Sequence, residues 1–195
     1  MPITAMSFAA IPVWTTQGVL PPINPTKPVS SVDRSPYVVS LTDIVLRFNT
    51  SPDRRKIIGG LLRYRAALHA VGLVSGFQWL DGSFMEDVET LEGRPPRDID
   101  IVTFYQLPAG TSQADILGRN PTLFDHETVK SAYHVDGYLV GLGMPPGRLV
   151  RQSAYWYGVW SHRRNDRWKG FLEIGLAPDQ DAEAVACLNA SGEPS

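Results

Sequence analysis

The sequence predicts one α/β (α+β) domain, built as a small mixed sheet flanked by helices and preceded by an extended proline-rich arm. Hydrophobic residues make up 43% of the 195 residues and charged residues 19%, which is typical of globular domains and excludes a disordered chain. Helical patterns mix with four short runs typical of strands, a combination that favours helices packed on a small sheet. Proline residues gather near the N-terminus and set that segment apart.

Residues 1–36 are predicted to form the arm. They contain seven of the 16 prolines. Because proline lacks a backbone donor and fixes φ, neither a helix nor a central strand is expected there. We expect Phe8, Trp14 and Leu20 to pack the arm against the body of the domain. A proline-rich ligand for a partner protein is the less favoured interpretation of this segment.

The folded body is predicted to span residues 37–190, followed by a frayed tail at 191–195. Its pattern is helical from Tyr37 onwards. Ser51-Pro52-Asp53 predicts a helix start, because serine caps the first turn, proline suits the first helical position and aspartate lies near the positive end of the helix dipole. Apolar residues then recur every three or four positions up to residue 71, which places them on one face.

The remaining elements follow from the hydrophobic pattern. Strands are expected at residues 76–80, 98–105, 133–142 and 168–176. Helices are expected at residues 111–117, 122–132, 149–163 and 179–188. Side chains alternate along a strand, so Asp98 and Asp100 are expected on one face and Ile99 and Ile101 on the other.

Charge and cysteine content limit the classes of function. The net charge of −2 and the pI of about 6.1 exclude a globally basic protein, so no long nucleic-acid track is expected. The single cysteine, Cys187, excludes a disulfide within the chain and a cysteine-cluster zinc site, which favours a reducing, cytoplasmic location. We expect no membrane partner, because we find neither a membrane-spanning stretch nor a secretory signal.

The main candidate site combines a Gly-Ser turn with paired carboxylates. Gly82 and Ser83 follow a predicted strand, and the exposed amides of such a turn can bind phosphate oxygens. Asp98 and Asp100 open the next strand, which places both on one face with Cα atoms roughly 6.5–7 Å apart. Converging aspartates suit two Mg²⁺ ions, the usual device for displacement at phosphorus. A role in turn formation and capping is the structural alternative.

A third carboxylate is expected from Asp136, which lies alone in the apolar run at 133–142. A buried charge without a partner is costly, and a metal ion would compensate it. An ion pair with a nearby arginine is the alternative interpretation of Asp136.

These residues together resemble a known signature. A Gly-Ser turn, then Asp-Ile-Asp-Ile, then a later strand with one acidic residue is similar to the pattern of the DNA polymerase beta-type nucleotidyltransferase superfamily. The segments WLDGSF and PRDIDIVTF resemble small bacterial nucleotidyltransferase-like proteins more closely, from about residue 20 to residue 176. The resemblance implies an NTP at Gly82 and Ser83. It also implies two Mg²⁺ ions, or Mn²⁺, on Asp98, Asp100 and Asp136, with Asp136 assisting the attacking hydroxyl.

Two other segments bear on the substrate. The loop between residues 83 and 98 is long for this superfamily and carries four acidic residues, which would repel a polyanion. The segment 162–169 is the densest basic cluster, and Lys169, on the fourth predicted strand, is the preferred phosphate contact. A solvated helix end is an equal alternative for this cluster. The nearby aromatics are expected in the core rather than stacked on a base; they are Trp156, Tyr157, Trp160 and Trp168.

Together these features predict an enzyme that moves a nucleoside monophosphate from an NTP to a hydroxyl acceptor and releases pyrophosphate. The acceptor is a partner protein, an RNA end such as that of tRNA, or a small molecule. A fold does not by itself establish function. The main alternative is therefore a non-catalytic nucleotidyltransferase-fold binding protein of a toxin–antitoxin or phage-defence module, and a hydrolase that uses the same carboxylates is a third interpretation.

Overall fold

The structure, a computed structural model, describes residues 10–28 and 30–190, so the expectations for Phe8 and for the tail at 191–195 lie outside it. The predicted mixed α/β class is confirmed. Five strands form one sheet in the order β1-β5-β2-β3-β4, in which β1–β5 and β3–β4 pair parallel and β2 is antiparallel to both neighbours. The strands are β1 Tyr37–Val38, β2 Gly76–Asp81, β3 Ile99–Tyr105, β4 Val135–Gly141 and β5 Leu172–Gly175.

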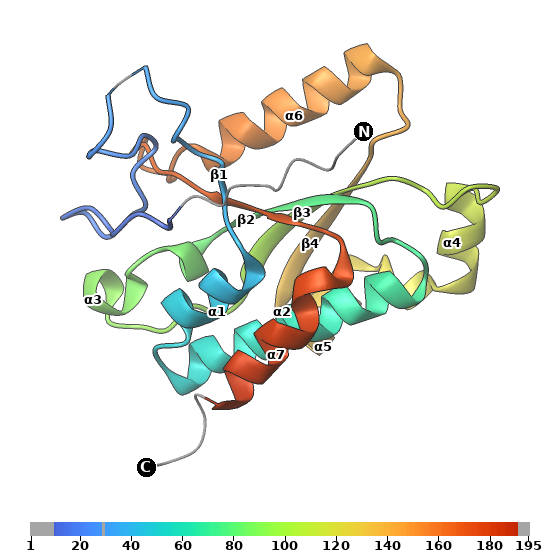
Figure 1. The fold of residues 1–195 in the computed structure, drawn as a ribbon, viewed down its shortest axis with the longest axis horizontal. Coiled ribbons are helices and arrows are strands. Elements are labelled where there is room, and N and C mark those ends of the chain that lie inside the picture. The colour runs from blue at the N-terminus through green and yellow to red at the C-terminus, as the bar shows by residue number, and fades with distance from the viewer. Residues whose placement is uncertain (1–9, 29, 191–195) are drawn as a thin grey trace.

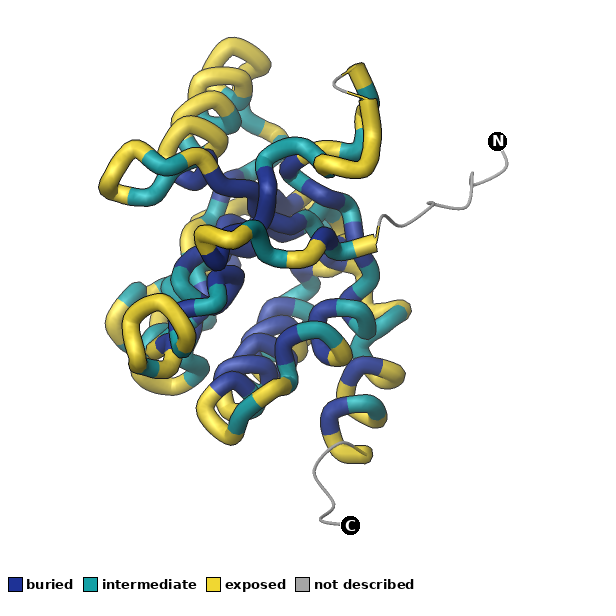
Figure 2. Tube along the Cα trace, turned by 90° about the vertical axis from the view of Figure 1, so that its left-hand side faces the viewer, coloured by how far each residue is buried: buried dark blue, intermediate teal, exposed yellow. Residues whose placement is uncertain are grey.

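Helices cover both faces of this sheet (Figure 1). The larger core lies under α1 (Leu41–Phe48), α2 (Pro52–Ala70), α5 (His126–Tyr133) and α7 (Asp181–Ala190). The opposite face carries α6 (Pro146–Trp160) and a smaller core. Figure 2 shows buried residues gathered in the middle of the molecule, with exposed residues on the outer sides of the helices. None of the helices in the described ranges combines the length and apolarity needed to cross a membrane.

Alternation along β3 decides which side chains reach each face. Ile99 and Ile101 enter the larger core, whereas Val102 and Phe104 enter the smaller core beneath α6. Asp100 shares its side of the strand with Val102 and Phe104, so its carboxylate lies on the α6 face. The predicted alternation is confirmed, and it directs the acidic side chains to the face with the smaller core.

The contact between α2 and α5 positions the start of β4. The side chain of Ser51 accepts a hydrogen bond from the Arg54 N–H, and α2 begins at Pro52, as predicted. Gly60 lies so close to the end of α5 that a Cβ there would stand 1.8 Å from the carbonyl oxygen of Tyr133. Only glycine allows this approach, which fixes the chain directly before the strand that carries Asp136.

Several boundaries differ from the sequence prediction. Residues 37–38 form β1 rather than a helix, because they pair parallel with β5. The strand expected at 168–176 is limited to Leu172–Gly175, so Lys169 precedes the strand. Two further segments adopt unpredicted short helices, α3 (Val88–Glu92) and the 3-10 turn Ser83–Met85. The last expected helix moves by two residues, and α4 spans Gln113–Arg119.

The described part of the N-terminal segment packs against the body. Leu20 is buried, and its carbonyl accepts a hydrogen bond from the Gly170 N–H at 2.7 Å. The indole N–H of Trp14 donates to the carbonyl of Met85 at 2.7 Å. Two of the three residues expected to anchor this segment therefore do so, and they hold it against the elements that surround the candidate site.

Candidate metal and nucleotide site

A row of three carboxylates crosses the sheet on the α6 face. Asp81 at the end of β2 is the register partner of Asp100 in β3, and Asp100 is the partner of Asp136 in β4. Neighbouring strands lie about 4.8 Å apart, so these side chains project side by side. Asp98, two residues before Asp100, lies on the same face. The structure thus brings the three predicted carboxylates together and adds Asp81, which the sequence analysis did not identify.

The Gly-Ser turn lies directly beside this row. Gly82 has a φ of 87°, and a Cβ at this position would stand 2.5 Å from Oδ2 of Asp100. Both the backbone conformation and the close approach require glycine here. Ser83 begins the 3-10 turn that ends at Met85. Gly82 and Ser83 line the same cleft as the carboxylates, which is the arrangement that the predicted phosphate contact needs.

Lys130, in the last turn of α5, stands between two of the carboxylates. Its ammonium lies 2.8 Å from Oδ2 of Asp136 and 3.0 Å from Oδ2 of Asp98. The hydrogen bond to Asp136, supported by Asp98, raises the pKa of Lys130 above its ordinary value. His126 Nε2 lies 3.4 Å from Oδ1 of Asp136. This aspartate oxygen is buried and has no hydrogen-bond partner within the described residues. The ion pair expected as the alternative for Asp136 exists, but with a lysine instead of an arginine.

Burial opposes ionisation of two carboxylates in the row, Asp100 and Asp81. Burial raises the pKa of Asp100 to about 7, and the charges of Asp81, Asp136 and Asp98 add to this shift. Burial also raises the pKa of Asp81 to about 6, against the lowering effect of the nearby Lys169 charge. A bound cation would therefore favour the ionised forms of Asp100 and Asp81.

Lys169 is a buried partner of the row. Only 6% of its side chain is exposed, and its ammonium lies 2.8 Å from Oδ2 of Asp81 and 3.1 Å from Oε1 of Glu86. The prediction that Lys169 lies on a strand is wrong, because the chain forms only an isolated bridge between His162 and Trp168 before it enters β5. Two carboxylates balance its charge, so Lys169 supports the wall of the cleft; its direct contact with a nucleotide stays a prediction.

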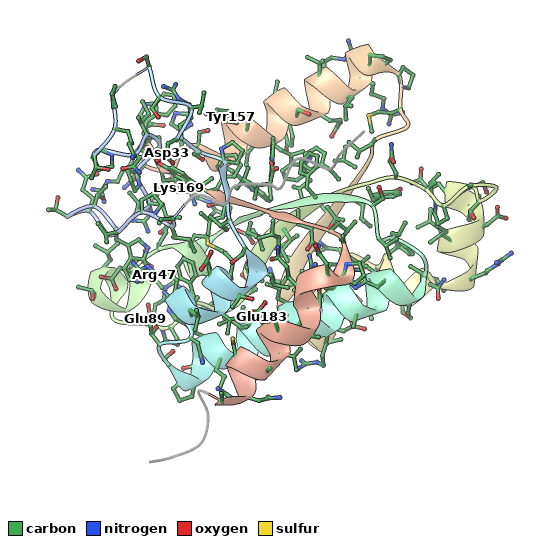
Figure 3. The ribbon with its side chains drawn as sticks, in the orientation of Figure 1. Asp33, Arg47, Glu89, Tyr157, Lys169 and Glu183 are labelled. Carbon is green, nitrogen blue, oxygen red and sulfur yellow. The ribbon has the colours of Figure 1, made fainter. Side chains whose placement is uncertain are left out.

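Arginine residues form ion pairs with most of the acidic side chains in the loop between residues 83 and 98. Glu89 accepts two hydrogen bonds from the buried Arg54. Arg163 forms ion pairs with both Glu86 and Glu92. Figure 3 shows Glu89 and Lys169 on the same side of the molecule. Because these glutamates are paired, the loop repels a polyanion far less than its composition predicts.

The carboxylates open into a cleft of about 1020 Å³. Its lining combines the carboxylates at the end of the sheet with aromatic side chains of β4 and α6 and with arginines. The aromatic residues are Tyr138, Tyr155, Trp156 and Trp160, and the arginines are Arg94, Arg97, Arg163 and Arg164. The expectation of a core position is confirmed for Trp160, which is buried, and is wrong for Tyr157 and Trp168, which are 39% and 60% exposed.

One family profile matches this chain, over residues 12–175. The chain belongs to DUF6932, a family of unknown function. The matched range includes the Gly-Ser turn and every aspartate of the row. No curated protein and no solved structure matches the chain, so the function of this DUF6932 protein has to be inferred from its site.

The donor set of the DUF6932 protein suits a divalent cation. Mg²⁺ and Mn²⁺ bind carboxylate oxygens, and one oxygen each of Asp81 and Asp136 is buried without a hydrogen-bond partner. Within residues 10–28 and 30–190, no three His, Cys, Asp or Glu side chains are arranged to hold a metal ion. The ammonium of Lys130 occupies the space between Asp98 and Asp136. The carboxylate chemistry suits the predicted ions, the described arrangement does not yet form a metal site, and the metal site itself stays a prediction.

Proposed function

We propose that this DUF6932 protein is a Mg²⁺-dependent nucleotidyltransferase that moves a nucleoside monophosphate from an NTP to a hydroxyl acceptor. The observation that carries the proposal is that Asp81, Asp100 and Asp136 are register partners on neighbouring strands. Asp98 lies on the same face, and Gly82 packs against Asp100. Carboxylates that repel one another beside a glycine turn suit the joint binding of metal ions and phosphates.

Each part of the site has a role in this reaction. Asp98, Asp100 and Asp136 would hold two divalent ions, which neutralise the charge of the triphosphate. The backbone amides at Gly82 and Ser83 would orient the phosphates. The acceptor oxygen attacks the α-phosphorus, the bond from that phosphorus to the bridging oxygen breaks, and pyrophosphate leaves. The carboxylate of Asp136 would receive the proton of the acceptor hydroxyl.

The rest of the cleft supports a nucleotide substrate. Arg97 and Arg164 line the cleft, where guanidinium groups can bind phosphate oxygens; Arg94 also lines it but pairs with Glu92. The aromatic lining from β4 and α6 offers flat surfaces on which a base can stack. The acceptor is a protein, an RNA end or a small molecule, since a net charge of −2 does not favour a long nucleic-acid track. We also infer a cytoplasmic location, because a chain with one cysteine suits a reducing compartment.

A second candidate function is a non-catalytic nucleotidyltransferase-fold protein that binds a partner in a toxin–antitoxin or defence module. The observation that favours it is Lys130, whose ammonium already pairs with Asp98 and Asp136. If this ion pair is permanent, it takes the place of a metal ion and the site cannot catalyse transfer.

Incubation with α-labelled NTPs and Mg²⁺ or Mn²⁺ separates these functions. The wild type is compared with the double variant Asp98→Ala/Asp100→Ala and with Glu183→Ala, a control that removes an exposed carboxylate from α7 on the opposite face of the sheet (Figure 3). The proposal predicts that label moves to an acceptor in wild type and in Glu183→Ala, with release of pyrophosphate, and that the double variant loses transfer.

Other outcomes identify the alternatives. Label that appears only as free nucleoside monophosphate or diphosphate, lost in the double variant, indicates a hydrolase. Absence of turnover together with absence of metal uptake in calorimetry favours the binding protein. Equal turnover by the wild type and the double variant excludes these carboxylates from the reaction.

A further inference from the structure

Two lysines reach the same group of carboxylates in different ways. Lys169 is 6% exposed and is held by Asp81 and Glu86. Lys130 is 39% exposed and pairs with Asp98 and Asp136. A buried ammonium with two buried partners is part of the fixed structure, since removing it leaves uncompensated charges. An ammonium on a flexible, half-exposed stem can leave its partners and enter water.

The carboxylate oxygens that accept from Lys130 are those a metal ion would need. The ammonium lies at hydrogen-bond distance from Oδ2 of Asp98 and Oδ2 of Asp136, whereas Mg²⁺ binds such oxygens at about 2.0–2.1 Å. A cation placed between these two aspartates would stand within a few ångströms of the ammonium, and the two positive charges would repel each other. Lys130 and a metal ion therefore cannot both occupy this position.

We infer that Lys130 is a built-in counter-ion that a divalent cation must displace from Asp98 and Asp136, so that this lysine sets the metal affinity of the site. The inference rests on the proposed function in using the same metal site. In this inference the acidic residues bind the cation, whereas Lys130 competes with the cation for two of them. While the ammonium is in place, it limits repulsion between two carboxylates; when a cation enters, the ammonium leaves and is exposed to reagents.

The affinity of the site for Mn²⁺ alone provides the first test. Calorimetric titration compares wild type with Lys130→Met, and with Lys56→Met as the matched control, because Lys56 is an exposed lysine on the adjacent helix α2. We expect Lys130→Met to bind Mn²⁺ about tenfold more tightly than wild type, since a competing charge has been removed. Lys56→Met is expected to match wild type. Equal or weaker binding by Lys130→Met would overturn the inference.

Labelling of the wild-type protein provides a second test that needs no variant. Amine acylation, followed by mass spectrometry, measures how fast Lys130 reacts with and without saturating Mn²⁺. We expect Mn²⁺ to increase the acylation rate of Lys130 at least about threefold, because displacement from the two carboxylates breaks the contacts that hold the ammonium and exposes it to the reagent. Lys56 serves as the internal reference. An unchanged Lys130 rate in protein that calorimetry shows to be saturated with Mn²⁺ would refute displacement.

The two proposals fail in different ways. If wild type and Lys130→Met bind Mn²⁺ equally well, the role of Lys130 is wrong and the metal-dependent function stands. If neither protein takes up Mn²⁺, although circular dichroism shows both to be folded, the metal-dependent function is wrong and the role of Lys130 falls with it. If only Lys130→Met binds Mn²⁺, the competition is supported and the ion pair of wild type is too strong for this metal to displace.

Discussion

The variant Asp100→Asn should be more stable than wild type at alkaline pH and equally stable at acidic pH. Burial and three neighbouring carboxylates raise the pKa of Asp100 from 3.8 to about 7. Between these values the folded state binds more protons than the unfolded state, so the stability of the wild type falls as the pH rises through this window. Asparagine has nearly the same shape and no proton to lose, so the variant avoids this fall.

The raised pKa also sets the size of the effect. A rise from 3.8 to about 7 corresponds to about 4 kcal/mol of unfolding free energy above pH 7. Because Asp81 titrates in the same cluster, we expect at least about 2 kcal/mol from the single variant. Urea unfolding without divalent cations, at about pH 4 and about pH 8.5, measures this difference. Glu183→Gln is the control for loss of an exposed carboxylate. Equal stabilities of wild type and Asp100→Asn at the higher pH would refute the reasoning.

Four other substitutions test the packing and the turn around the site. Lys169→Met should lower the unfolding free energy by about 3–5 kcal/mol, because two buried carboxylates lose their cation; a wild-type thermal midpoint would contradict this. Gly60→Ala should cost more than about 3 kcal/mol in denaturant unfolding, because its Cβ would stand 1.8 Å from the Tyr133 carbonyl. The neighbouring Gly59→Ala, with its nearest atom 3.4 Å away, should instead gain about 0.5–1 kcal/mol. Gly82→Ala should be less stable than wild type, because its Cβ would stand 2.5 Å from Oδ2 of Asp100, and should lose nucleotidyl transfer; an active Gly82→Ala variant would show that the turn does not need glycine for phosphate binding.

Local sequence patterns predicted much of the fold. Capping residues located the start of α2 at Pro52, and alternation along β3 assigned Asp100 to the face opposite Ile101. These features depend on residues that are close together in the sequence, so a local sequence pattern can predict them. The strand β1 is only two residues long and is held by pairing with β5, so it has no period to detect.

The candidate site was predicted only in part, because register and ion pairing are not local. Asp98, Asp100 and Asp136 could be proposed from motif and strand context. Asp81 could not, since its place in the row follows from the pairing of β2 with β3. A usable signal was present: Asp81 lies two residues after the core residue Trp79 and therefore shares its face. The role of Lys130 had no such signal, because it depends on how α5 packs beside the sheet.

The most direct test of the proposed site is a crystal structure of the full chain grown with Mn²⁺ and a non-hydrolysable NTP analogue. Anomalous scattering locates manganese without reference to the protein. We predict manganese bound by Asp98, Asp100 and Asp136, with the phosphates of the analogue at Gly82 and Ser83. Manganese and nucleotide bound elsewhere on the protein, with these three carboxylates carrying neither, would contradict the nucleotidyltransferase account.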